Sequence, residues 1–187
     1  MTTLRVGVDI DDVLYPWSEV AHRLSVRAGL AQPGTPTPPT WAPFEVYGCP
    51  ADDWYAVLAD GARTGELYFD RPAPGARDAL ARLRGAGHTV HLVTARGFLH
   101  NGNLIRRHTV QWLAAHRIPH DTLTFSRQKT VITTDVFVDD AEHNVHELRD
   151  AGVPVYLMDA PHNRHVTGFD RVHSIADFAE RILTRGH

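Results

Sequence analysis

The chain has 187 residues, of which 43% are hydrophobic and 22% charged, a composition that excludes a disordered protein and predicts a folded domain with its own core. Its net charge of −3 at pH 7 excludes a nucleic-acid polymer as the main partner, because such partners need a basic face. No apolar run reaches membrane-spanning length, no signal segment is visible, and the lone Cys49 cannot form an intrachain disulfide, so we expect a cytoplasmic protein.

Short apolar segments rich in β-branched residues alternate with amphipathic segments along most of the chain. This alternation predicts an α/β fold with parallel strands joined by helices. The predicted strands cover residues 4–10, 88–94, 136–139 and 153–158, and the predicted helices cover residues 18–30, 52–62, 74–87, 103–118, 142–152 and 174–183.

Residues 16–73 interrupt this alternation. Two predicted helices flank residues 31–50, which are rich in proline and predicted to be irregular. We therefore expect a small helical insertion at 16–73, and an α/β core built from residues 1–15 and 74–187.

Carboxylates collect where the predicted strands end. Asp9 and Asp11 end the first strand, Thr94 ends the second, and Asp139 and Asp140 end a later one. The carboxyl ends of parallel strands share one edge of a sheet, and crowded carboxylates repel one another. A hard divalent cation removes that repulsion, so the pattern predicts a Mg²⁺ site.

A single aspartate after a strand is more often a turn or helix-cap residue, and Asp12 and Asp140 fit that simpler interpretation as well. The ordered set of D-x-D, threonine, lysine and D-D favours a functional site. Lys129 is the only lysine beside 18 arginines (19 − 1), which indicates a role that arginine cannot fill.

Four segments resemble the motifs of the haloacid dehalogenase superfamily of phosphotransferases: "VDIDDVLY", "LVTAR", "SRQKT" and "FVDDAEHN". Within it the chain is similar to the 5'(3')-deoxyribonucleotidases, through "LTFSRQKTVITTDVFVDD", "APHNRHV" and "RVHSIADF". The resemblance implies a three-layer, Rossmann-like core with a parallel sheet, a small helical C1-type cap formed by the insertion, and a Mg²⁺-dependent phosphomonoesterase.

The resemblance also implies catalytic roles. Asp9 would attack phosphorus as the nucleophile, and Asp11 would protonate the leaving group and then act as a base on water. The Thr94 hydroxyl and the Ala95 amide would hold phosphoryl oxygens, and Lys129 would neutralise the nucleophile and the phosphate.

The metal-ligand set implied is Asp9, Asp11 and Asp139, with the Asp11 contribution coming from the backbone region. Asp140 would act on the metal through water or would orient Lys129.

Trp17 and Trp41 match positions where the resembled nucleotidases place aromatic rings against the base. Arg96 and Arg127 are candidate phosphate contacts, although Arg96 could instead pair with a surface acid. The expected substrate is a nucleoside 5'-monophosphate, with a deoxyribonucleotide preferred. Two alternatives stay open: another small phosphate ester, such as a sugar phosphate or biosynthetic intermediate, and a catalytically silent nucleotide-binding protein. A homodimer is also left open.

Histidines offer one competing interpretation. His143 with His146, or His162 with His165, could hold a soft metal, but no cysteine joins them and the phosphate chemistry requires oxygen ligands. We therefore do not predict a zinc site.

Overall fold

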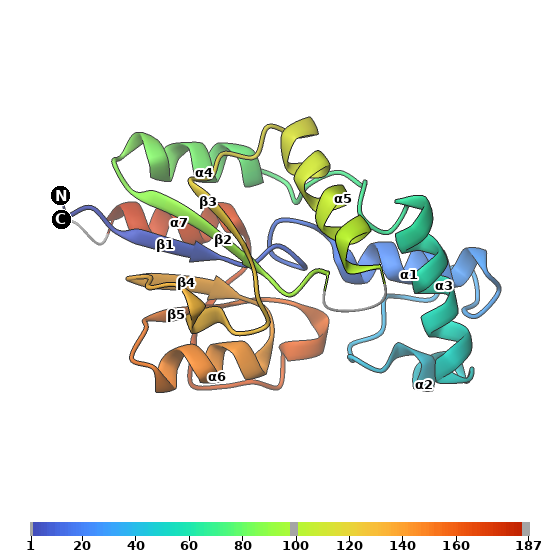
Figure 1. Ribbon diagram of the computed structural model, residues 1–187. Coiled ribbons are helices and arrows are strands. Elements are labelled where there is room, and N and C mark those ends of the chain that lie inside the picture. The colour runs from blue at the N-terminus through green and yellow to red at the C-terminus, as the bar shows by residue number, and fades with distance from the viewer. Residues whose placement is uncertain (1, 98–100, 185–187) are drawn as a thin grey trace.

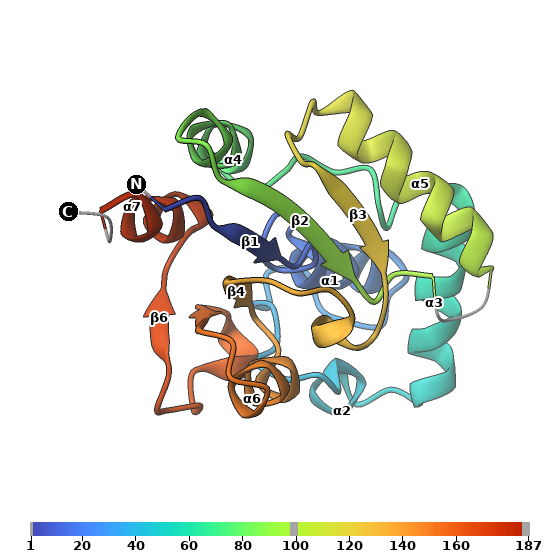
Figure 2. The same cartoon turned by 60° about the vertical axis from the view of Figure 1, so that its left-hand side comes forward.

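The computed structural model describes residues 2–97 and 101–184, and within them it contains one six-stranded parallel sheet (Figures 1 and 2). The strand order is β3-β2-β1-β4-β5-β6, so β1 lies between β2 and β4. The strands are β1 (Arg5–Val8), β2 (Thr89–Thr94), β3 (Thr122–Phe125), β4 (Val136–Asp139), β5 (Val155–Met158) and β6 (Asp170–Val172). The α/β class predicted from the alternating segments is confirmed.

Helices cover both faces of the sheet, because β1, β2, β4 and β5 are apolar on both sides (Figure 1). The helices α4, α5 and α7 pack on one face around a core that includes Val6, Leu92 and Trp112, and α6 packs on the other. None of the helices in residues 2–97 and 101–184 combines the length and apolar composition needed to cross a membrane. Their bounds are α4 (Ala76–Gly85), α5 (Gly102–Ala115), α6 (Glu142–Asp150) and α7 (Ile175–Thr184).

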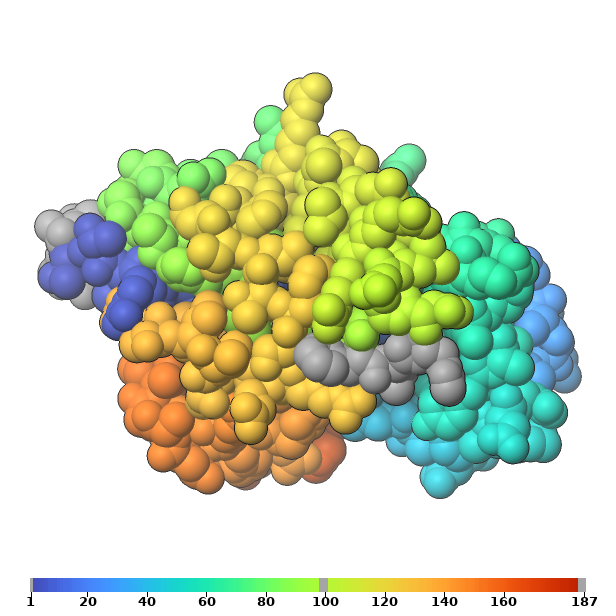
Figure 3. Space-filling model, in the orientation of Figure 1, coloured from blue at the N-terminus to red at the C-terminus, as the bar shows by residue number. Residues whose placement is uncertain are grey.

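The segment between β1 and α4 forms a helical unit at the carboxyl end of the sheet, seen at the right of Figures 1 and 3. It contains α1 (Trp17–Arg27), α2 (Pro43–Tyr47) and α3 (Ala51–Thr64). The prediction that residues 31–50 are irregular throughout was wrong, because α2 forms inside them. Its proline stands in the first turn, where a helix tolerates the missing N–H, and Gly48 ends it with a left-handed backbone.

The strands β3 and β6 were not predicted. Both are short, and most of their side chains are only partly buried, so neither shows the continuous apolar run that marks the central strands. They extend the sheet at its two edges, and the four predicted strands lie side by side between them.

Gly7 of β1 leaves room for an aromatic ring from β4. A Cβ added to Gly7 would stand 2.1 Å from the Phe137 ring, whose side chain fills the space over the glycine. The lack of a side chain at Gly7 therefore lets a buried aromatic ring cover the centre of the sheet.

The two ends of the helical unit are tied together where they join the core. The Tyr15 hydroxyl donates to the Leu67 carbonyl (2.9 Å) and accepts the Asp70 N–H (3.2 Å). Trp112 of α5 donates its indole N–H to the Asp70 carbonyl (2.7 Å). One tyrosine and one tryptophan thus fix where the insertion leaves the sheet and returns to it.

Candidate active site

The carboxyl ends of β1, β2 and β4 meet in the middle of the sheet. Asp9 directly follows β1, and its N–H donates to the Val138 carbonyl of β4 (3.1 Å). Asp139 is the last residue of β4, and Thr94 is the last residue of β2, on the other side of β1. Because strand order reverses direction at β1, this edge is where a doubly wound sheet leaves room for a ligand.

Lys129 reaches this edge from the short helix η1 (Lys129–Val131), which precedes β4. Its Nζ donates to Asp9 Oδ1 (2.6 Å) and to the Val93 carbonyl (2.9 Å), and lies 3.5 Å from Asp139 Oδ2. The lysine side chain is only 1% exposed. The buried ammonium group therefore joins two carboxylates and a strand carbonyl.

Burial and charge shift the pKa values of this pair. Burial raises the pKa of Asp9 to about 7, although the neighbouring Lys129 pulls in the opposite direction. Burial disfavours the charged form of Lys129, but Asp9 and Asp139 outweigh it and hold the lysine pKa above its usual range. A charged Lys129 therefore stabilises the ionised form of Asp9.

Asp139 and Asp140 differ in how their oxygens are satisfied. Asp139 Oδ1 accepts the Ala141 N–H and the Asn144 amide, both at 2.9 Å. Asp139 Oδ2 and Asp140 Oδ2 are buried and accept no hydrogen bond. Burial, and the charge of Asp139 beside it, raise the pKa of Asp140 well above its usual value. Two buried carboxylate oxygens at the same edge of the sheet thus accept no hydrogen bond.

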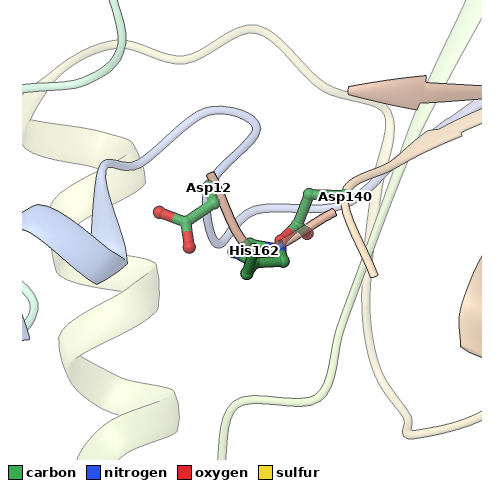
Figure 4. Close-up of side chains that lie close together, drawn as sticks. All are labelled: Asp12, Asp140 and His162. Atoms are coloured by element: carbon green, nitrogen blue, oxygen red, sulfur yellow. Dashed lines mark ion pairs between the residues drawn. The ribbon is translucent and has the colours of Figure 1, made fainter. Parts of the chain in front are cut away.

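The structure adds His162 to the site, where the sequence did not predict it. Its buried Nε2 lies 2.9 Å from Asp140 Oδ2, and Asp12 completes a group of three (Figure 4). Its ring packs on the Trp41 ring, with centroids 4.0 Å apart, and burial lowers its pKa to about 4. His165, the partner considered in the sequence, instead lies near Glu142 (3.3 Å). Spacing along the chain could not reveal the contact with Asp140.

Asp12 acts as a cap for the insertion's first helix. Its Oδ1 accepts the Ser18 N–H (2.9 Å), its other oxygen accepts the Ser18 hydroxyl, and its backbone has a positive φ of 52°. Aspartate is one of the few residues that adopt this conformation at low cost. This geometry supports the simpler interpretation of Asp12, although burial raises its pKa to about 6.

Asp11 is held by Arg96, which follows β2. The guanidinium donates from Nε to both carboxylate oxygens (2.9 and 3.0 Å) and from Nη2 to Oδ1 (2.6 Å). The arginine side chain is 1% exposed and that of Asp11 is 30% exposed. Arg96 therefore pairs with an acid of the site itself, where the sequence analysis considered the phosphate or a surface acid.

The remaining expected residues occupy different environments. Thr94 is fully buried and its hydroxyl accepts the Arg96 N–H (3.2 Å), whereas Ala95 and Arg127 are exposed. Trp17 and Trp41 line one small pocket of the insertion, which Trp54 also lines. Through the contact between Trp41 and His162, this pocket adjoins the carboxylate cluster.

Comparison with known proteins identifies the family. Residues 62–186 match the family described as 5' nucleotidase, deoxy (pyrimidine), cytosolic type C protein. The chain belongs to this family. A Chlorobaculum tepidum protein provisionally named as a 5'(3')-deoxyribonucleotidase is 34% identical over 103 residues, which are 54% of this chain and 51% of that protein. The match therefore spans about half the length of this curated relative.

Solved structures share the fold of this nucleotidase-family chain. A HAD-superfamily hydrolase from Geobacter sulfurreducens aligns with a TM-score of 0.55 at 17% identity, covering 96% of this chain and 100% of that one. A D,D-heptose 1,7-bisphosphate phosphatase from B. bronchiseptica, solved with magnesium and phosphate, aligns with a TM-score of 0.54 at 17% identity, covering 97% and 99%. The predicted haloacid dehalogenase fold is confirmed.

The residues of this nucleotidase-family site fit a hard divalent cation. Asp9, Asp139 and Asp140 each offer an oxygen within 4.8 Å of the others. Two of these carboxylates carry a buried oxygen without a hydrogen bond, and oxygens of this kind are suitable ligands for a hard cation. The Asp11 carboxylate is paired with the charged Arg96, so the expected contribution of Asp11 to a metal site is from its backbone.

Proposed function

We propose that this chain is a Mg²⁺-dependent phosphomonoesterase that dephosphorylates nucleoside 5'-monophosphates, with deoxyribonucleotides preferred, through a phosphorylated Asp9. The observation that carries the proposal is the buried contact between Lys129 and Asp9, at the edge where Asp139 and Asp140 each have an oxygen that accepts no hydrogen bond. A charged lysine and a cation would together accept the negative charge of a phosphate ester.

In the first step an Asp9 oxygen forms a bond to phosphorus while the bond from phosphorus to the ester oxygen breaks. The departing oxygen takes a proton from Asp11, and the product alcohol leaves. Lys129 keeps Asp9 ionised before the attack and balances charge on the phosphoryl group during it. The Thr94 hydroxyl and the Ala95 amide would hold the phosphoryl oxygens.

In the second step Asp11 takes a proton from a water molecule as that water attacks phosphorus. The bond between Asp9 and phosphorus breaks, which frees inorganic phosphate and restores the Asp9 carboxylate. Mg²⁺ held by Asp9, Asp139 and Asp140 would supply charge neutralisation and orient the phosphate. Asp139 would also hold Lys129 in place, because its Oδ2 lies 3.5 Å from Nζ.

The insertion supports the assignment of a nucleotide as the substrate. Trp41 is 52% exposed, and its ring packs on His162 beside the carboxylate cluster. Trp17 lies in the same small pocket. An aromatic ring this near the phosphate site would stack on a base, an interaction worth about 1–3 kcal/mol. The proposal also assigns residues 16–73 as a cap over the core formed by residues 1–15 and 74–187.

The location and assembly of the protein remain predictions. The lone cysteine and the cytosolic type of the matched family support a cytoplasmic location. The acidic net charge supports a small-molecule substrate over a nucleic-acid polymer. A homodimer would be tested by light scattering.

The test is the hydrolysis of p-nitrophenyl phosphate with Mg²⁺, with EDTA, and by the Asp9→Asn variant, followed by a panel of nucleotides and sugar phosphates. We expect turnover only with the metal and the intact aspartate, and the highest kcat/KM on a deoxynucleoside 5'-monophosphate. Turnover by Asp9→Asn at the parent rate would refute the mechanism. A sugar phosphate as the best substrate would support the alternative phosphatase, and no turnover of any ester would support the silent binding protein.

A further inference from the structure

Arg96 is the most enclosed cation of the site after Lys129, and the mechanism above gives it no part. Its guanidinium lies 4.7 Å from the ring centre of Tyr15, 4.8 Å from that of Tyr68 and 5.8 Å from that of Trp112. These distances are in the range of cation–π attraction. Its Nη1 is buried without a hydrogen bond, so this edge of the group faces aromatic surface.

The aromatic box, Tyr15, Tyr68 and Trp112, is itself rigid. Tyr15 and Trp112 pack edge to face, with centroids 5.2 Å apart, and both hydrogen-bond to the returning linker of the insertion. Because the rings surround the rest of the guanidinium, Arg96 donates its side-chain hydrogen bonds to Asp11. Arginine suits this position because its planar fork can stack on rings and bind a carboxylate at the same time.

The contacts on Asp11 are uneven. Oδ1 accepts two donors of Arg96, at 2.9 and 2.6 Å, whereas Oδ2 accepts a single one at 3.0 Å. The Asp11 side chain stays 30% exposed while its partner is sealed. Oδ2 therefore keeps more of its accepting capacity than Oδ1 does.

We propose that Arg96 is a positioning residue that holds the Asp11 carboxyl where it can give a proton to the leaving group, with the aromatic box fixing the guanidinium. This inference rests on the proposed function, since it assumes that Asp11 is the acid. It differs from a phosphate-binding role for Arg96, because Asp11 occupies the donors on one edge of the guanidinium and aromatic rings surround the rest of the group.

The test uses two esters that present nearly the same shape. Phenyl phosphate and p-nitrophenyl phosphate differ in how much their leaving oxygen needs a proton, because p-nitrophenol is the stronger acid. The value of kcat/KM reports the steps through cleavage of the ester, so it registers the loss of an acid. The ratio of the two kcat/KM values on one sample does not depend on how much of that sample is folded.

We expect Asp11→Asn to lose about 10²-fold or more in kcat/KM on phenyl phosphate and far less on p-nitrophenyl phosphate. Arg96→Gln and Arg96→Lys should show the same selective loss, roughly tenfold or more in the ratio. In the double variant Asp11→Asn/Arg96→Gln the second substitution should add little to the ratio. Arg82→Gln, which breaks an exposed ion pair with Glu180, is the matched control and should leave the ratio unchanged.

Three outcomes separate the possibilities. If Asp11→Asn lowers both esters equally, the acid assignment in the proposed function fails. If Asp11→Asn is selective but both Arg96 variants lower the two esters equally, Arg96 has a structural role only and this inference is overturned. If the Arg96 variants instead weaken inhibition by inorganic phosphate in parallel with an equal loss on both esters, Arg96 binds phosphate, which also overturns it.

Discussion

The ammonium group of Lys129 makes contacts in three directions, to Asp9, to the Val93 carbonyl and to Asp139. A guanidinium presents its donors in one plane and is larger, so it cannot reproduce these contacts in a space that is already closed. This geometry gives a physical reason for the one lysine in a chain that otherwise uses arginine.

We therefore expect Lys129→Arg to lower kcat by about 10²–10³-fold, because a preorganised donor beside the reacting phosphate is lost. Steady-state kinetics on p-nitrophenyl phosphate with Mg²⁺ measure this. Arg82→Lys serves as the control, since that side chain is half exposed. A variant within threefold of the parent kcat would contradict the role assigned to the lysine.

The residue scale also shows what a sequence can reveal about a site. Carboxylates at strand ends are visible in the sequence, because parallel strands bring their carboxyl ends together, and the structure places Asp9, Asp139 and Asp140 in one cluster. The pairing of Asp11 with Arg96 joins residues 85 positions apart. This pairing depends on the direction of the loop that follows β2, and the spacing of apolar residues in the sequence does not predict that direction.

At the scale of elements, the central strands were predictable and the edges were not. Buried strands have apolar residues at nearly every position, and packed helices have an apolar stripe. Both can therefore be recognised in the sequence. Ser174 was also predictable as the cap of α7, and its hydroxyl accepts the Asp177 N–H (3.0 Å). The strands β3 and β6 carry mixed side chains, since one side of an edge strand has no neighbouring strand to bury it.

Packing between β1 and β4 predicts the effect of filling Gly7. Gly7→Ala would place a methyl group 2.1 Å from an atom of the Phe137 ring, and overpacking of this kind costs about 1–3 kcal/mol. We expect the Tm to fall by roughly 2–12 °C, as measured by calorimetry. Gly85→Ala is the matched control, because nothing lies within 4 Å of its added methyl group. Equal Tm values for the two variants would show that the strands move apart freely.

The insertion is the element expected to set substrate preference. Trp17→Ala should raise KM for a deoxynucleoside 5'-monophosphate about tenfold, within the range expected for one lost stacking contact, and change KM for a small alkyl phosphate little. Steady-state kinetics on both substrates measure the difference. Tyr55→Ala removes an exposed ring of the same unit and should not discriminate between them. Equal effects of Trp17→Ala on both substrates would refute stacking by Trp17.

For the whole molecule, we expect the carboxylate cluster to make the free energy of unfolding depend both on pH and on bound metal. The pKa of Asp140 is higher in the folded chain than in the unfolded one, because of burial and the charge of Asp139. Such a group favours folding fully below its unfolded pKa, about 3.9, and this contribution is lost as the pH rises toward the folded value. The metal-free protein therefore carries a cost at neutral pH that a cation would remove.

We expect Asp140→Asn in EDTA to have a higher Tm than the parent at pH 8, with the gap closing toward pH 4. Comparing the two proteins at each pH cancels the titration of the histidines that lie away from Asp140, and His162 is the one in direct contact with the substituted residue. Mg²⁺ at 100 times its dissociation constant should stabilise the parent by about 2.7 kcal/mol and the variant by less. A parent that is the more stable protein in EDTA at pH 8 would contradict this account.

The hydroxyl of Tyr15 touches both the Leu67 carbonyl and the Asp70 N–H, and so fastens the departing chain to the returning chain. Together with the Trp112 contact to Asp70, this tyrosine anchors both ends of the insertion to the core. We therefore expect that exchanging the chain between Tyr15 and Leu67 would change the substrate that the proposed phosphatase accepts, while Asp9 stays in place as the proposed nucleophile.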